Sequence, residues 1–244
     1  MFERIVCGVD GSAESLEAVR QADTLLEQGG RLVLVSVVDL SDTIHFQIAP
    51  TAIHAARRAL ARAEELDRQA LEALEHAGAA IRWASDVAKV EIAGPPATSL
   101  VETAVAENAG LVTVGTHGRG RMAGIALGSV ATRILHRAPC SVLLARRGAA
   151  DGWSPRTIVA GVDGSAEAEA ALTAARGLES RFEASLRIVT VEHGRAAHGL
   201  VEAAADADLV VLGSRGMHGA RALGSVSERV AHEAPCSVLV VRGA

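Results

Sequence analysis

Aromatic residues are scarce in this chain of 244 residues: there is no Tyr, and Phe and Trp together make up 2% of the residues. The core must therefore be built from aliphatic side chains, since 49% of the residues are nevertheless hydrophobic. Buried parallel strands of Val, Ile and Leu, covered by alanine-rich helices, meet this requirement. The composition favours an α/β fold.

Lysine is almost absent: Lys89 stands alone beside 23 arginines. A Walker A loop requires Gly-Lys-Ser/Thr, which this chain lacks, so any phosphate site must use backbone N–H groups, Ser and Arg. The net charge of −5 argues against general affinity for nucleic acid, which needs a broad basic surface.

Long hydrophobic runs are missing too: no apolar run reaches membrane-spanning length, and residues 1–10 lead directly into a strand-like segment. We therefore expect no signal peptide and a cytoplasmic protein. The few cysteines, Cys7, Cys140 and Cys236, match no zinc spacing and lie in or beside strand-like runs. We interpret them as small buried hydrophobic residues.

What the chain does contain is an internal duplication. IVCGVDGSAE from Ile5 returns as IVAGVDGSAE from Ile158, and the LGSV…APCSVL motif from Leu127 returns from Leu223. The first motifs are 153 residues apart but the last only 96, so the second copy is shorter by 57 residues. Two of these fall in a glycine loop, and 55 fall between the first and fourth strands. The repeat predicts domains at 1–147 and 157–244 joined by a linker at 148–156.

Hydrophobic patterning predicts five strands alternating with four helices in the first copy. This is a doubly wound, Rossmann-like parallel sheet, for which we expect the order 3-2-1-4-5. The second copy lacks the second helix and third strand, and so has lost the edge strand of its sheet. We therefore expect a partner to cover this edge. The predicted strands are 4–10, 32–38, 83–92, 111–114 and 142–145, and the helices 13–28, 51–78, 98–107 and one after the glycine loop; the second copy has strand two at 186–191 and a helix from 200.

The glycine loop reads Gly115-x2-Gly118-x9-Gly128-Ser129 and joins a strand to a helix. Free N–H groups and the positive end of a helix dipole make such a junction suited to phosphate. Residues 108–150 contain no acid but six arginines, which suits a polyanion. The alternative is a loop that only connects the two elements.

Asp10 ends the first strand and should face Gly115 at the point where strand order reverses. Its carboxylate can accept a hydrogen bond from an exocyclic amine, while the backbone near Val37 can contact a flat ring. The alternative is that Asp10 forms an Asp-Gly turn or caps the next helix. His117 and Arg119 either contact phosphate or are solvated loop residues, and His136 and His232 are more consistent with caps or surface groups. A rival dinucleotide motif at 118–123 lacks the acid expected about 20 residues further on.

Both copies resemble the universal stress protein family, and the chain is similar to its tandem members. The resemblance rests on GVDGS at the first strand, GPPA before the third helix, the glycine loop and APCSVL at the last strand. It covers residues 1–147 and, with the internal loss, 157–242. The spacing of the glycines in the first copy is that of the family's ATP-binding branch.

The resemblance implies ATP with Mg²⁺ as the ligand of the first copy. Adenine would contact Asp10 and the backbone near Gly8, Val9 and Val37. Ribose and triphosphate would contact the loop and helix start, at Gly115, Gly118, Gly128, Ser129 and Val130. The matching residues of the second copy are Asp163, Val191, Gly213, Gly216, Gly224 and Ser225. Arg215 stands where the first copy has His117. Because that loop is two residues shorter and the second copy is truncated, we expect a competent site in the first copy and a weak or ligand-free one in the second.

These observations are most consistent with a cytoplasmic nucleotide-binding module for the stress response, acting on a protein partner that the sequence does not name. One alternative is an enzyme, a slow ATP hydrolase or nucleotidyl-transferring protein, although no catalytic arrangement is recognisable. Another is a nucleotide-free scaffold. The resemblance also implies that fifth strands, 141–145 and 237–241, pair edge to edge, either within one chain or with a second molecule.

Overall fold

The computed structural model describes residues 2–39, 52–118, 127–146, 152–190, 196–214 and 223–243. We call residues 2–146 the first half and 152–243 the second half. The elements of the first half are β1 (Phe2–Gly8), α1 (Ala13–Leu25), β2 (Leu26–Val38), α2 (Ala52–Ala79), β3 (Asp86–Ala93), α3 (Pro96–Ala106), β4 (Leu111–Gly115), α4 (Ser129–Arg137) and β5 (Ser141–Ala145). Those of the second half are β6 (Thr157–Val162), α5 (Ala166–Phe182), β7 (Ser185–Thr190), α6 (Ala196–Ala203), β8 (Leu209–Gly213), α7 (Ser225–Glu233) and β9 (Ser237–Val241).

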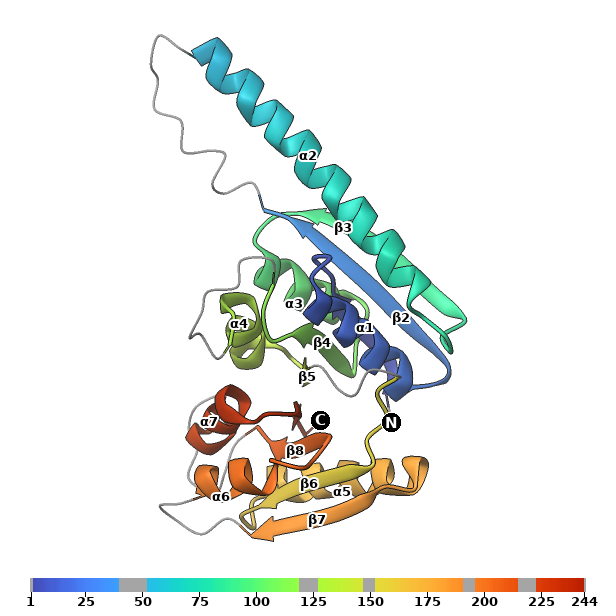
Figure 1. The fold of residues 1–244 in the computed structure, drawn as a ribbon, viewed down its shortest axis with the longest axis vertical. Coiled ribbons are helices and arrows are strands. Elements are labelled where there is room, and N and C mark those ends of the chain that lie inside the picture. Colours follow the sequence, from blue (N-terminus) through green and yellow to red (C-terminus); the bar gives the residue numbers. More distant parts are fainter. Residues whose placement is uncertain are drawn as a thin grey trace.

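The strands form a single nine-stranded sheet in the order β3-β2-β1-β4-β5-β9-β8-β6-β7 (Figure 1). Neighbouring strands are parallel within each half and antiparallel where β5 meets β9. The first half therefore has the predicted order 3-2-1-4-5, and the described residues of the second half contain no counterparts of α2 and β3. The predicted tandem doubly wound fold is confirmed, while the exact domain boundaries stay a prediction.

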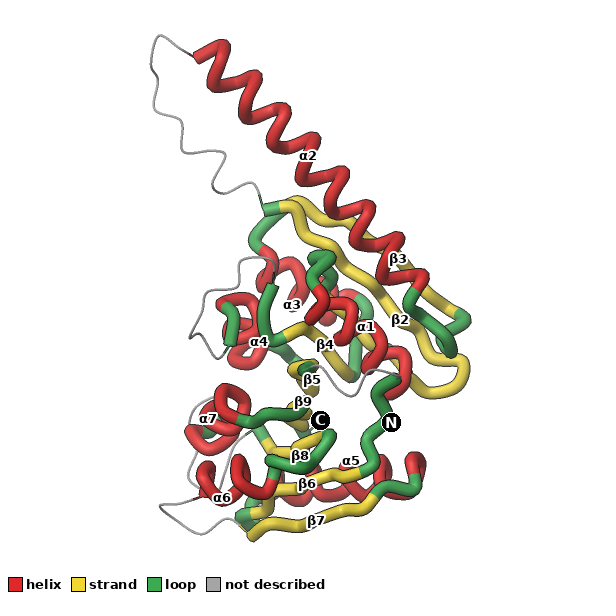
Figure 2. The backbone as a smooth tube through the Cα atoms, in the orientation of Figure 1, coloured by secondary structure: helices red, strands yellow, loops and turns green. Residues whose placement is uncertain are grey.

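Helices cover both faces of this sheet (Figure 2). Side chains of α1, α2 and α5 pack in one hydrophobic cluster, and those of α3, α4, α6 and α7 pack in the other. Each cluster contains residues of both halves, so the core is continuous through the junction.

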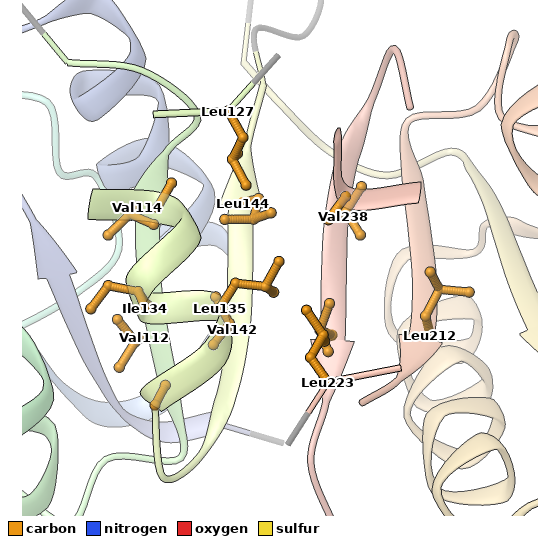
Figure 3. Close-up of a cluster of buried hydrophobic side chains, with 14 of the residues drawn as sticks. Val112, Val114, Leu127, Ile134, Leu135, Val142, Leu144, Leu212, Leu223 and Val238 are labelled. Atoms are coloured by element: carbon orange, nitrogen blue, oxygen red, sulfur yellow. The ribbon is translucent and has the colours of Figure 1, made fainter. Parts of the chain in front are cut away.

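Of the two arrangements expected for the fifth strands, the structure shows the pairing of β5 with β9 within one chain. Val142, Leu143 and Leu144 lie opposite Val240, Leu239 and Val238. Figure 3 shows Leu144 and Val142 of β5 and Val238 of β9 in the cluster that α4 covers. Full burial of such an aliphatic side chain contributes roughly 1.5–3 kcal/mol to stability, which the junction shares with the helices packed on it.

Some element boundaries differ from the sequence-based expectation. Helix α1 ends at Leu25, not near Gln28, and β2 follows at once through an irregular stretch with Gly29 at φ +78°. Strand β1 ends at Gly8, before Asp10. Strand β3 begins at Asp86 rather than at residue 83, because a side chain of α1 binds the backbone of residues 82–84. Helix α6 begins at Ala196, four residues before the expected start at Leu200.

The truncation of the second half leaves part of β7 uncovered. Ile5 pairs with Leu32 and Ile158 with Leu186, so Ile188 holds the position that Leu34 holds in the first half. Leu34 is fully buried in the cluster that includes Ala73, Leu74 and Ala77 of α2, whereas Ile188 is 48% exposed. Among the described residues, nothing thus covers Ile188 as α2 covers Leu34, and a partner for this surface stays a prediction.

Candidate functional site

The candidate site lies at the carboxyl ends of β1 and β4, which are neighbours in the sheet. The chain leaves β1 for α1 on one face and reaches α4 on the opposite face after β4. In open α/β sheets, this divergence opens the crevice in which ligands bind.

Asp10 lies at this switch point and forms the turn into α1. Its Oδ1 accepts hydrogen bonds from the backbone N–H of Ser12 at 2.9 Å and from Ser12 Oγ at 2.5 Å. Gly11 between them has φ +78°, a conformation that favours glycine. Ser12 Oγ in turn caps α1 by accepting from the N–H of Ser15 at 3.1 Å. The turn-forming alternative for Asp10 is therefore present in the structure, and it leaves the ligand-binding role of Asp10 a prediction.

The other carboxylate oxygen of Asp10 faces the glycine loop. A Cβ on Gly118 would overlap Asp10 Oδ2, so the loop backbone packs directly against this carboxylate. The expected proximity of Asp10 to the loop after Gly115 is thus present, at Gly118.

The loop is closed at its base by a backbone hydrogen bond of 2.7 Å from Gly128 N–H to the carbonyl of Thr116. His117 stands beside this base and has its Nδ1 3.2 Å from Thr116 Oγ1. Residues 119–126 lie outside the described residues, and Arg119, a predicted phosphate contact, is among them. The described part of the loop thus joins Asp10, through Gly118 and His117, to the start of α4.

Helix α4 begins at Ser129 with Gly128 as its N-cap. Glycine has no side chain with which to cap the helix, and the first turn carries no acidic residue. Ser129 is exposed and Val130 is half-buried, both at the positive end of the helix dipole. This end of α4 is suited to an anion.

Two of the predicted ligand contacts have a packing reason in the structure. A Cβ on Gly8 would lie 2.9 Å from Leu100 Cδ1, and a Cβ on Gly115 would lie 2.7 Å from the carbonyl carbon of Glu14. Glycine at these positions lets α3 and α1 approach the sheet. The sequence carries no local signal for these long-range contacts, and sequence reasoning missed them.

The strand ends near the predicted adenine position are held by backbone bonds. Val9 is buried and its N–H donates to the carbonyl of Val35 at 2.8 Å. Val37 is half-buried and lies opposite Ile92 of β3. The structure brings these residues to the same edge of the sheet as Asp10.

The second half repeats this geometry. Asp163 Oδ1 accepts from Ser165 N–H at 3.0 Å and Ser165 Oγ at 2.6 Å, and Gly224 N–H donates to the Ser214 carbonyl at 2.7 Å. Gly213 packs against Glu167 as Gly115 packs against Glu14. The two-residue difference in loop length thus falls within residues 215–222, which lie outside the described residues. The predicted contacts Gly216 and Val191 and the loop cation Arg215 also lie outside the described residues.

Helix α7 differs from α4 in its first turn. Ser225 is exposed like Ser129, but Glu228 lies in the first turn of α7. Glu228 Oε1 is 3.2 Å from His136 Nε2 of α4, so the helices meet across the junction. A carboxylate in the first turn opposes binding of an anion there.

The cysteines do not form a reactive site. Burial raises the pKa of Cys140 and Cys236 to about 11 and raises that of Cys7 further, so all three thiols stay protonated near neutral pH. Among the described residues, no group of three or more His, Cys, Asp and Glu side chains could hold a metal ion. No described helix is both long enough and apolar enough to cross a membrane.

Comparisons with known proteins agree on one family and one fold. The model of the universal stress protein family matches residues 1–146 and 187–242. A universal stress protein of Thermus aquaticus is 30% identical over 148 residues, which are 60% of this chain and 100% of that protein. One from Mycolicibacterium smegmatis is 28% identical over 304 aligned positions, covering 98% of this chain and 96% of that protein. The crystal structure of a universal stress protein from Archaeoglobus fulgidus superposes with a TM-score of 0.64 at 21% identity, covering 98% of this chain and 96% of that one.

Proposed function

Because the chain belongs to the universal stress protein family, we propose that its first half binds ATP with Mg²⁺ and that the protein is a cytoplasmic, nucleotide-dependent module of the stress response. The observation that carries the proposal is the contact series Asp10–Gly118–His117–Gly128, which ends at the uncapped start of α4. A universal stress protein that is 27% identical over 59% of this chain was solved in complex with cAMP, so an adenine nucleotide is a ligand of one protein of the family.

The described residues suit the parts of this ligand. The triphosphate would lie against the N–H groups of residues 129 and 130 and the dipole of α4, with Ser129 Oγ as a further donor. Adenine would lie at the ends of β1 and β2, near Asp10 and Val37. Mg²⁺ commonly binds through phosphate oxygens, waters and one or two carboxylates, so it would enter with the nucleotide.

The first half is favoured over the second by charge. The first turn of α4 has no acidic residue, whereas that of α7 contains Glu228. A polyanion gains from the α4 dipole without opposition from a carboxylate in the first turn of that helix. We propose that the nucleotide binds in the first half and that Asp163, Gly213, Gly224 and Ser225 form a weak or ligand-free copy of the site.

The duplication supplies a matched pair of variants, Ser129→Asp and Ser225→Asp. Both residues are exposed at a helix start, where a negative charge stabilises the helix. We expect wild type and S225D to bind one ATP per chain by isothermal titration calorimetry, and S129D to bind at least about tenfold more weakly because the new carboxylate repels the triphosphate.

Equal affinity of S129D and wild type would refute this placement, and a loss in S225D alone would move the site to the second half. If the wild-type protein does not bind ATP, the alternative function as a nucleotide-free scaffold is favoured. Steady-state release of phosphate above that of Ser129→Ala would instead indicate a hydrolase.

A further inference from the structure

A second cleft, separate from the nucleotide loop, runs along α1 between the two halves. It has a volume of about 1040 Å³. The turn after α2, the segment before β6 and the end of α5 complete its walls. In Figure 2, that segment, drawn as a loop, runs from the end of α1 to β6.

This cleft collects the aromatic residues of an aromatic-poor chain. The chain has three Phe and two Trp, and Trp83, Trp153 and Phe182 all line the cleft. Trp153 is 7% exposed and forms part of the core, whereas Trp83 is 76% exposed. A large exposed indole beside a cleft is a common feature of a binding surface.

The wall that carries Trp83 is fixed by a buried carboxylate. Asp23 of α1 is 3% exposed, and it accepts hydrogen bonds from the backbone N–H groups of Arg82 at 2.7 Å, Trp83 at 3.1 Å and Ala84 at 2.8 Å. The exposed indole is therefore held on a rigid turn. Such preorganisation lowers the entropic cost of binding a ligand.

The opposite wall is fixed in a similar way. The guanidinium of Arg181 donates to the carbonyls of Thr24 at 2.9 Å, Leu25 at 3.0 Å and Leu26 at 2.7 Å, and it lies 5.1 Å from the centre of the Phe182 ring. Thr24 Oγ1 donates to the Trp153 carbonyl at 3.4 Å. The end of α5 and the segment before β6 are thereby tied to the end of α1.

The charges of the cleft exclude a polyanion as its ligand. Its lining has three arginines, Arg20, Arg82 and Arg181, and three acids, Glu17, Asp23 and Glu27. Glu17 accepts from Gln21 Nε2 at 2.8 Å and pairs with Arg20 at 3.4 Å, while Asp23 and Arg181 are bonded to the backbone. Leu16 and Leu26 contribute apolar surface between these groups.

We propose that this cleft binds a small, planar, uncharged organic molecule that stacks on Trp83. The volume is that of small-molecule sites, about 300–1,000 Å³, and is far below the size of a folded partner. The equal numbers of arginines and acids, four of which (Glu17, Arg20, Asp23 and Arg181) are already bonded, favour a neutral ligand. Three aromatic side chains favour a flat one.

Intrinsic fluorescence can test the proposal directly. The chain has no Tyr, and both Trp residues line the cleft, so Trp emission reports on this cleft. The probe is N-phenylnaphthylamine, an uncharged aromatic molecule that accepts energy from Trp. We expect saturable energy transfer from wild type with one probe per chain, unaffected by added ATP.

The variants Trp83→Ala and Leu71→Ala form the matched pair. Both remove an exposed hydrophobic side chain, 76% and 56% exposed, but Leu71 does not line the cleft. Probe affinity, measured by the probe's own emission, should fall about tenfold in W83A and stay unchanged in L71A. Wild type should also gain thermal stability from the probe, and W83A should not. Unsaturable binding, or equal effects of the two substitutions, would overturn the proposal.

Discussion

Arg146 and Arg242 cross the β5–β9 junction in opposite directions, and each caps the last helix of the other half. Arg146 donates to the carbonyls of Ala231 at 2.5 Å and Cys236 at 3.1 Å, and Arg242 donates to the carbonyl of Leu135 at 2.6 Å. Burial lowers the pKa of Arg146 from its usual value. The two halves are therefore joined by charged groups as well as by aliphatic packing.

Replacing Arg146 by Met should lower the free energy of unfolding by about 2 kcal/mol, because the substitution leaves two carbonyls without their charged donor. Urea denaturation measures this change. Arg133→Met, at an exposed position of α4, is the control and should stay within about 0.5 kcal/mol of wild type. A similar small effect for R146M would show that the crossing arginine contributes nothing to the junction.

Gly8→Ala should destabilise the protein by about 1–3 kcal/mol, since the added methyl would lie 2.9 Å from Leu100 Cδ1. Thermal or urea unfolding would reveal the loss. The double variant Gly8→Ala, Leu100→Ala should lose less than the sum of the single substitutions, because removing the Leu100 side chain relieves the overlap. Additive losses would show that the two residues do not compete for space.

The truncation makes a prediction about two matched strand positions. Leu34→Ala should cost about 2–5 kcal/mol, because Leu34 is fully buried beneath α2. Ile188→Ala should cost less than about 1 kcal/mol, because the corresponding cover is missing and Ile188 is 48% exposed. If I188A costs as much as L34A, something other than the described residues covers β7 in solution.

The order of the sheet could be predicted from the sequence because its signals are local or repeated. Apolar runs alternate with helical patterns, and the duplicated IVxGVDGSAE motif fixes which strands correspond. The position of Asp10 beside the glycine loop follows from the same topology. These features need no knowledge of side-chain packing.

The second cleft and the glycine contacts could not be predicted in this way. Asp23 and the turn at residues 82–84 are about 60 residues apart in the chain, and no local pattern joins a carboxylate in α1 to that turn. The early end of α1 also depends on a long-range contact, because Leu26 pairs with Phe2 of β1 and therefore belongs to β2. Tertiary contacts override local helix preference at that point.

Alkaline pH should destabilise the protein through its buried thiols. Thiols in an unfolded chain ionise near pH ~8.5, whereas burial raises the pKa of Cys140 and Cys236 to about 11. The folded state then binds more protons than the unfolded state, so stability falls as the pH rises from about 9 to about 11. We expect a loss on the order of 2 kcal/mol per buried thiol, measured by urea unfolding under reducing conditions.

The absence of Tyr and the single Lys make this pH window simple to interpret. A variant with Cys140 and Cys236 both replaced by Ala should lose less stability over the same range. An equal loss in that variant would assign the alkaline effect to other groups.

Gly199→Ala should raise stability by up to about 1 kcal/mol. Gly199 lies inside α6, and a Cβ there would meet no described atom within 4 Å. Alanine loses less backbone freedom than glycine on forming a helix. A rise in the urea midpoint with an unchanged slope would support the argument, and a fall would indicate a steric conflict at that position.

The antiparallel pairing of β5 with β9 also sets how the protein responds to dilution. Two separate subunits joined by the same strands would part as their concentration fell, but a covalent connection keeps the effective concentration of the two strands constant. Whatever the protein concentration, the β5–β9 junction therefore stays formed, and its formation needs no second copy of the chain.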